Sequence, residues 1–199
     1  MDMSASALTG ALRVGLQVVV ARKRPVLEIY QTLNNTFGPP FDIDMKDRTG
    51  TKTLRTDQHR FQDIFIDLTL INIGSIRAEN VTFKLSGDFK RGEPRDAFPE
   101  LFNSNVRQIA PGQPLYLMRI DDHDLNVYSP DPEGSTTAFR ASGIKTTVLT
   151  IAVEYDGPAS FFNWLISRHR KWRGLKQYSM QFTFDPMTVL GDLPPAKYA

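Results

Sequence analysis

The stretch of the chain with the strongest potential for chemistry is residues 160–176, SFFNWLISRHRKWRGLK, which we call the basic–aromatic segment. It contains five basic residues and no acidic residue. Basic side chains bind phosphate groups, and aromatic rings between them can stack on bases or lie at a membrane surface. Exposed tryptophan and arginine also anchor protein–protein interfaces. The composition therefore indicates a contact surface and leaves its partner open.

Seven residues of this segment are the candidate partner-binding residues: Phe161, Trp164, Arg168, Arg170, Lys171, Trp172 and Arg173. In a helix, Phe161, Leu165 and Trp172 would lie on one face. Because Arg168 would fall on that same face, the separation into apolar and basic faces is imperfect. A plainer interpretation is that the apolar half covers an edge of the β-structure while the basic half is solvated.

Two acidic clusters match metal-ligand patterns only weakly. Asp42, Asp44 and Asp47 begin like a calcium loop. However, Lys46 stands at the third ligand position and no glycine follows it. The second cluster is the run DDHD at 121–124, where neighbouring side chains of an extended chain point in opposite directions. We expect a solvated turn there, no metal site and no cofactor.

The sequence offers little for catalysis. It lacks cysteine, which excludes disulfides, thiolate metal sites and cysteine nucleophiles. The three histidines, His59, His123 and His169, stand in no known catalytic or phosphate-binding motif. A Ser–His–Asp arrangement can be formed by residues far apart in sequence, so an enzyme stays a distant alternative. We predict no enzymatic activity and no small-molecule substrate.

The net charge of +2 conceals an uneven distribution. Residues 1–25 carry +3 and residues 160–176 carry +5, which leaves −6 for the remaining chain. The sequence thus combines an acidic body with two basic segments, and these are the surfaces on which a partner is expected.

Alternating apolar residues predict six strands, at 26–33, 64–73, 80–85, 115–120, 148–155 and 178–184. The long connections at 34–60 and 121–146 offer two shorter candidates, 41–44 and 136–140. Helical periodicity is scarce between the two ends of the chain. Many strands without crossover helices favour an all-β, immunoglobulin-like antiparallel β-sandwich.

Four short motifs carry a resemblance to a known family: DLTLINIG at 67–74, AENVTF at 78–83, IAPGQ at 109–113 and IAVEYDG at 151–157. They resemble bacterial immunoglobulin-like modules, among them the cell-adhesion-related domain found in bacteria. The resemblance covers residues 26–186 and implies a scaffold in which Asn and Gly turn the chain between two strands. It implies no catalytic residues, because these motifs are structural. The chain departs from it through its long insertions.

The domain boundaries follow from these patterns: an amphipathic N-terminal segment at 1–25, the β-sandwich at 26–186 and a flexible tail at 187–199. Residues 4–21 are apolar overall, and the patterns of helix and strand both fit them. Their positive charges follow the apolar stretch, whereas a secretory signal carries them before it. Arg13 and Gln17 interrupt the apolar run. We expect a cytoplasmic protein, with membrane anchoring through 4–21 left open.

Two functional hypotheses result. The first is a non-catalytic interaction or accessory module that binds a protein partner, or itself, through residues 158–176. The alternative is a binder of polyanions, either nucleic acid or an anionic membrane surface, through the same residues.

Overall fold

The computed structural model describes residues 24–47, 49–92, 97–130, 139–158, 168–170 and 172–198. This part of the chain consists mostly of β-strands in antiparallel sheets, which confirms the predicted all-β class. Of the predicted N-terminal segment, only Arg24 and Pro25 are among the described residues.

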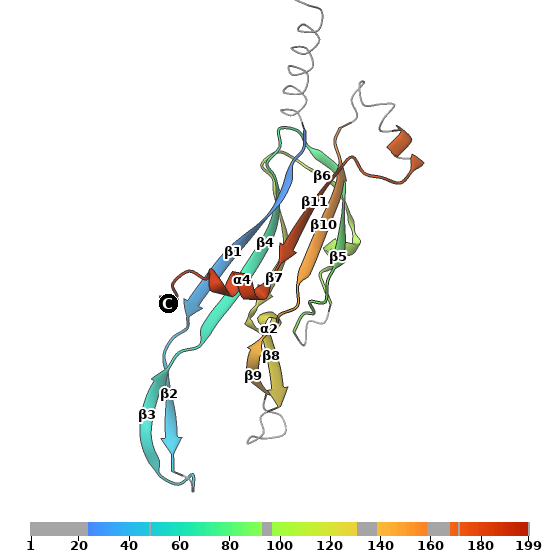
Figure 1. Cartoon of the computed structure of the whole chain (residues 1–199). Helices are drawn as coiled ribbons and strands as arrows, with labels where there is room; N and C mark the ends of the chain where they lie inside the picture. The colour runs from blue at the N-terminus through green and yellow to red at the C-terminus, as the bar shows by residue number, and fades with distance from the viewer. Residues whose placement is uncertain are drawn as a thin grey trace, which may run out of the picture.

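Two four-stranded sheets form the body of the molecule (Figure 1). The first has the order β12-β1-β4-β7, with β1 at Leu27–Phe37, β4 at Gln62–Asn72, β7 at Pro114–Asp121 and β12 at Lys197–Tyr198. The second has the order β11-β10-β5-β6, with β5 at Ala78–Ser86, β6 at Asn105–Ile109, β10 at Leu149–Asp156 and β11 at Tyr178–Phe184. Neighbouring strands are antiparallel, except that the short β12 runs parallel to β1.

The core lies between the facing sides of these two sheets. Ile66, Leu68 and Leu70 of β4 are fully buried, and so are Ile151 and Val153 of β10. All five belong to one hydrophobic cluster. Within each strand these residues are two positions apart, because successive side chains of a strand point to opposite faces of the sheet. The alternation in the sequence therefore marks the rows that face the core.

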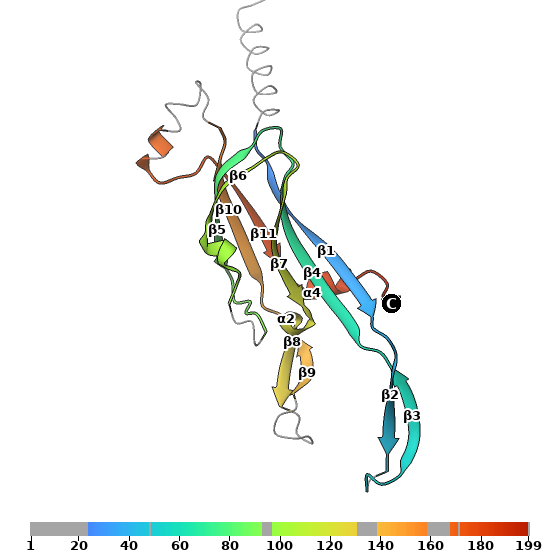
Figure 2. The ribbon, with the colours of Figure 1, turned by 180° about the vertical axis from the view of Figure 1, so that it is seen from behind.

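Two hairpins extend from the body. One pairs β2 (Phe41–Lys46) with β3 (Thr53–His59), and the other pairs β8 (Asn126–Pro130) with β9 (Phe139–Ile144). Both project beyond the lower end of the sheets, opposite to the end at which β1 begins (Figures 1 and 2). We call the β2–β3 hairpin the arm.

Helical structure among the described residues is short: η1 at Glu100–Asn103, α2 at Asp122–Leu125 and α4 at Pro186–Gly191. The sequence predicted a flexible tail from residue 187. In the structure α4 begins at an Asp185 cap that accepts a bond from Met187 N at 3.0 Å. Farther on, Tyr198 of β12 stacks on Phe37, with ring centroids 5.4 Å apart.

All six predicted strands are present, with boundaries shifted by a few residues. The candidate at 41–44 lies within β2, and the candidate at 136–140 overlaps only the start of β9. Strands β3, β6, β8 and the two-residue β12 were not predicted. The reason is clearest for β3, whose sequence TLRTDQH has no apolar alternation. No helix within the described ranges combines the length and apolarity required to cross a bilayer.

Candidate interaction surface

The basic–aromatic segment connects β10 to β11 at the end of the sheets where β1 begins (Figure 1). The structure describes residues 168–170 and 172–176 of it. Four of the seven candidate residues, Arg168, Arg170, Trp172 and Arg173, are therefore described. Phe161, Trp164 and Lys171 lie outside the described residues.

The base of the segment is fixed at the end of β10. The carboxylate of Asp156 accepts a hydrogen bond from Gln177 N at 3.1 Å. The Gln177 side chain in turn accepts a bond from Gly157 N at 2.9 Å. These two bonds close the neck of the connection, because they join the residues on either side of it.

Two basic side chains of the segment are used in this anchoring. Lys176 Nζ donates to the carbonyl oxygen of Asn80 at 2.9 Å and lies 3.5 Å from Asp156 Oδ2. Arg170 Nη1 donates to the carbonyl oxygen of Gln177 at 3.1 Å. Part of the positive charge thus has a structural role.

The described helical turn, Arg168–Arg170 and Trp172, ends in a well-defined cap. Leu175 N donates to the carbonyl oxygen of Arg170 at 2.9 Å, and Gly174 has a φ of +67°. A left-handed residue followed by a bond back across the last turn is the Schellman motif. The cap fixes the direction in which Trp172 and Leu175 leave the backbone.

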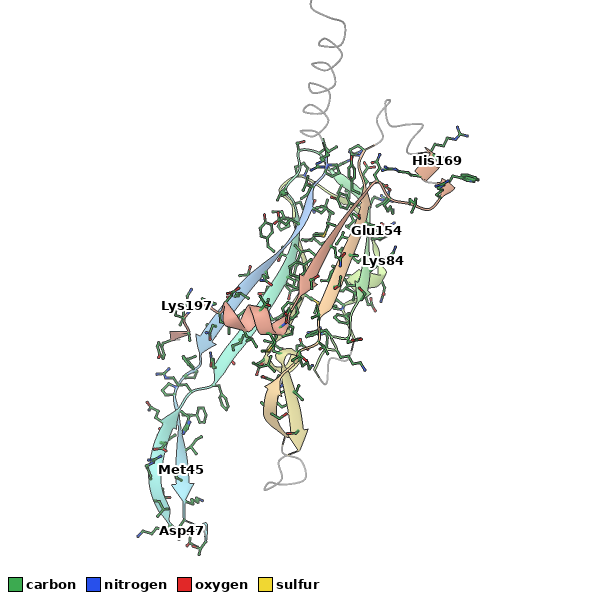
Figure 3. All side chains as sticks on the ribbon, in the orientation of Figure 1. Met45, Asp47, Lys84, Glu154, His169 and Lys197 are labelled. Atoms are coloured by element: carbon green, nitrogen blue, oxygen red, sulfur yellow. The ribbon has the colours of Figure 1, made fainter. Side chains whose placement is uncertain are left out.

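The side chains on either side of this cap are exposed to solvent. Trp172 is 83% exposed and Leu175 is 57% exposed. Arg168 and Arg173 are exposed as well. Figure 3 shows His169 at the outer end of the segment, away from both sheets, and its ring centroid lies 6.3 Å from that of Trp172. A large apolar side chain is therefore presented among basic ones on an anchored base.

The start of the described chain lies against the same neck. A Cβ atom placed on Gly157 would be 3.4 Å from Pro25 Cδ. Leu27 N donates to the hydroxyl oxygen of Tyr155 at 3.3 Å. Burial raises the pKa of Tyr155 above its ordinary value of 10.0, so the group is neutral at physiological pH. Arg24 is exposed at this junction and follows Arg22 and Lys23 in sequence.

We call the surface formed by these exposed or half-buried side chains the basic end: Arg24, Arg168, Arg170, Trp172, Arg173 and Leu175. The sequence marked two separate basic segments, and the structure brings their described parts to one end of the domain. The arrangement can attract an anionic surface and insert an indole ring into it. No sequence signal predicted that the two segments adjoin, since this depends on the order of the strands.

The aspartates of the arm do not converge on a common point. Asp44 Oδ1 accepts a bond from the Thr56 hydroxyl at 2.6 Å across the hairpin. Asp47 instead accepts bonds within the turn, from the Thr49 hydroxyl at 2.8 Å and from Thr51 N at 3.0 Å. Both carboxylates therefore stabilise the hairpin itself.

The DDHD run is not simply a solvated turn, as the sequence suggested. Asp121 caps α2 by accepting a bond from Asp124 N at 3.2 Å. Asp124 is buried, pairs with Arg91 at 2.9 Å and accepts a bond from Gly92 N at 2.7 Å. The helical turn, which the sequence reasoning missed, rotates this carboxylate into the protein. Among the described residues, no group of three potential ligands could hold a metal ion.

The three histidines lie on three different elements. His59 is on β3 beside Phe41, with ring centroids 6.4 Å apart. His123 is in α2 and stacks on Tyr128 at 5.6 Å. His169 lies in the basic–aromatic segment. The structure thus does not assemble these histidines into one site.

Comparison with known proteins gives a family. A family model described as "Domain of unknown function (DUF8453)" matches residues 51–189. This span runs from the arm to α4 and includes the whole basic–aromatic segment. No curated protein and no solved structure matches the chain. Because the matched residues make up most of the sequence, the chain belongs to the DUF8453 family of domains of unknown function.

Proposed function

We propose that this chain is a non-catalytic, immunoglobulin-like β-sandwich module that docks on an anionic membrane surface through its basic end. The observation that carries this proposal is Trp172. Its indole is 83% exposed on a capped turn whose base is hydrogen-bonded to β10. An exposed tryptophan costs free energy in water, and the bilayer interface is an environment that suits its amphipathic ring.

The immunoglobulin-like assignment is supported by the arrangement of the strands. Two four-stranded sheets share one hydrophobic cluster, as the inner faces of a β-sandwich do. The N-x-G motif is also used as the family resemblance implies: Asn72 ends β4, and its side chain accepts a bond from Gly74 N at 2.9 Å. A module of the bacterial cell-adhesion-related type accounts for both features.

The distribution of charge supports an anionic surface as the partner. Arg24, Arg168 and Arg173 are exposed at one end of a chain whose other parts are net acidic. The acidic body would orient the molecule with its basic end toward an anionic surface. A basic residue near such a surface contributes about 1 kcal/mol of attraction. Trp172 and Leu175 supply the apolar contacts that hold a monotopic protein at the interface.

The sequence that precedes Arg24 is consistent with the basic end facing a membrane. Residues 22–24 are Arg-Lys-Arg, and the apolar stretch 4–21 comes before them. Arg24 lies at the neck of the basic–aromatic segment. Any membrane contact made by residues 4–21 would therefore tether the chain at the end of the domain that carries the basic end.

The test uses tryptophan fluorescence, because the two tryptophans of the chain, Trp164 and Trp172, both belong to the basic–aromatic segment. In the full chain carrying Trp164→Phe, all tryptophan emission comes from Trp172. We expect this emission to shift to the blue with vesicles that contain phosphatidylglycerol, and brominated acyl chains to quench it. Phosphatidylcholine vesicles should have much less effect, and added salt should weaken the response.

A charge variant and a matched control complete the test. Arg173→Gln should lower the affinity for phosphatidylglycerol vesicles about fivefold, which corresponds to one basic contact. Lys52→Gln, an exposed lysine of the arm at the opposite end, should change nothing. If Trp172 emission is neither shifted nor quenched by anionic vesicles, the proposal is wrong. A protein that photo-crosslinks to position 172 in that case would establish the other hypothesis.

A further inference from the structure

The arm carries an exposed apolar face that no other described element covers. Ile43 and Met45 of β2 are 37% and 48% exposed. Figure 3 shows Met45 on the projecting hairpin, clear of the two sheets. A two-stranded hairpin is marginally stable in water, and a further layer packed on its apolar face would stabilise it.

The register of the arm defines the composition of this face. Ile43 pairs with Asp57 and Met45 pairs with Arg55. Directly opposite residues of an antiparallel pair point to the same side. The face therefore consists of an apolar row on β2 and a charged row on β3. In the charged row, Arg55 Nη2 lies 2.5 Å from Asp57 Oδ2.

This face is complementary to itself. Consider a two-fold axis in the plane of contact, perpendicular to the strands, that passes between the pair Ile43–Asp57 and the pair Met45–Arg55. Rotation about this axis lays Ile43 of one copy over Met45 of the other, and Arg55 of one copy over Asp57 of the other. One operation thus satisfies the apolar row and the charged row together, as an isologous interface requires.

We propose that the arm is a dimerisation element and that its face packs against the same face of a second copy of this chain. The four charged side chains would then alternate in sign around the axis, so that each Arg55 contacts two carboxylates. A partner surface with charges of only one sign would place a like charge against Arg55 or against Asp57. A second copy therefore fits better than an acidic or a basic protein.

The expected dimer is weak, since a face of two short strands is small compared with a standard interface. The test is sedimentation velocity of the full chain over a concentration series, in which wild-type protein should shift from monomer to dimer. Arg55→Asp puts a second carboxylate opposite Asp57 of the other copy, and Asp57→Arg puts two guanidinium groups in contact. Each variant should weaken the dimer by at least about tenfold.

Mixing the two variants separates contact between copies from damage within one arm. An Arg55→Asp chain carries two acidic residues and an Asp57→Arg chain carries two basic ones, so the mixture should form a heterodimer at least as tight as the wild-type dimer. The double variant R55D/D57R should dimerise again. Met45→Gln, which adds no charge, should weaken the dimer through the apolar row alone.

Lys84→Glu is the matched control, because it reverses an exposed charge on the body, at β5. It should leave the dimer unchanged. A wild-type chain that stays monomeric throughout would overturn the proposal. A mixture that associates no better than its components would overturn it too, and would show that any dimer uses another surface.

Discussion

Asn72 Nδ2 donates a hydrogen bond to the carbonyl oxygen of Ile109 at 3.0 Å, and this contact ties the end of β4 in the first sheet to the end of β6 in the second. The same amide nitrogen donates to the carbonyl oxygen of Ile76 at 2.8 Å. On its other side, Asn72 Oδ1 accepts bonds from Gly74 N at 2.9 Å and from Val26 N at 3.3 Å. One fully buried side chain therefore binds four backbone groups, in three segments of the chain, at the end of the molecule that carries the basic end.

Asn72→Ala should lower the free energy of unfolding by about 3 kcal/mol, because it leaves buried backbone donors and acceptors without partners. Urea denaturation would show this loss as a lower midpoint with an unchanged slope. Asn105→Ala, at an exposed position of β6, is the control and should change stability by less than about 0.5 kcal/mol. Similar midpoints for the two variants would contradict the assigned role of Asn72.

Gly74→Ala should disturb the entry of the chain into β1. A Cβ atom on Gly74 would lie 2.4 Å from both Arg24 O and Val26 N, which are backbone atoms that cannot rotate away. We expect a loss of about 2 kcal/mol or more, measured by thermal unfolding. Gly191→Ala is the matched control, since nothing lies within 4 Å of its added Cβ. Equal melting temperatures for the two alanine variants would refute the close approach.

The core strands were predictable because their physical cause is local. Ile66, Leu68 and Leu70 alternate with the polar residues Asp67 and Thr69, and only one face of their strand can reach the core. Strand β3 was not predictable, because its partner is β2 and neither face of the hairpin packs on the core. Its strand structure depends on cross-strand pairing, which leaves no apolar periodicity in the sequence.

The basic end was predictable only in part. Composition alone identified the candidate residues around Trp172, since five basic residues without an acid are unusual. The contact between Pro25 and the neck at Gly157 was not predictable, because it depends on the start of β1 and the end of β10 lying at the same end of the two sheets. The burial of Asp124 was missed for a similar reason: its partner Arg91 lies far away in sequence.

The Arg91–Asp124 pair yields a prediction about buried charge. Its side chains are 8% and 1% exposed, whereas those of the Lys84–Glu154 pair are 67% and 32% exposed (Figure 3). Arg91→Met should cost about 3 kcal/mol, because it leaves the Asp124 carboxylate buried without its counter-charge. Lys84→Met should cost less than about 1 kcal/mol, since water screens the exposed pair. Chemical denaturation measures both, and equal costs would mean that burial of Asp124 is unimportant.

The tip of the arm is held by a carboxylate, which makes it sensitive to acid. Asp47 accepts bonds from the Thr49 hydroxyl, from Thr51 N and from Lys52 N. The hydrogen bond from Thr49 and then that from Lys52 are the main causes that lower the pKa of Asp47 below its ordinary value of 3.8. These bonds favour the ionised form in the folded chain.

The lowered pKa of Asp47 determines how the stability of the arm's tip changes with pH. A carboxylate with a lowered pKa contributes stability that is present above its unfolded value and is lost as the pH falls through its folded value. We therefore expect the amide resonances of Thr51 and Lys52 to stay constant near neutral pH and to move in acid with a midpoint below 3.8. In Asp47→Asn the side chain does not titrate, so this movement should disappear while the core resonances stay unchanged. Movement of the Thr51 and Lys52 amides that persists in Asp47→Asn would assign the acid response to another group.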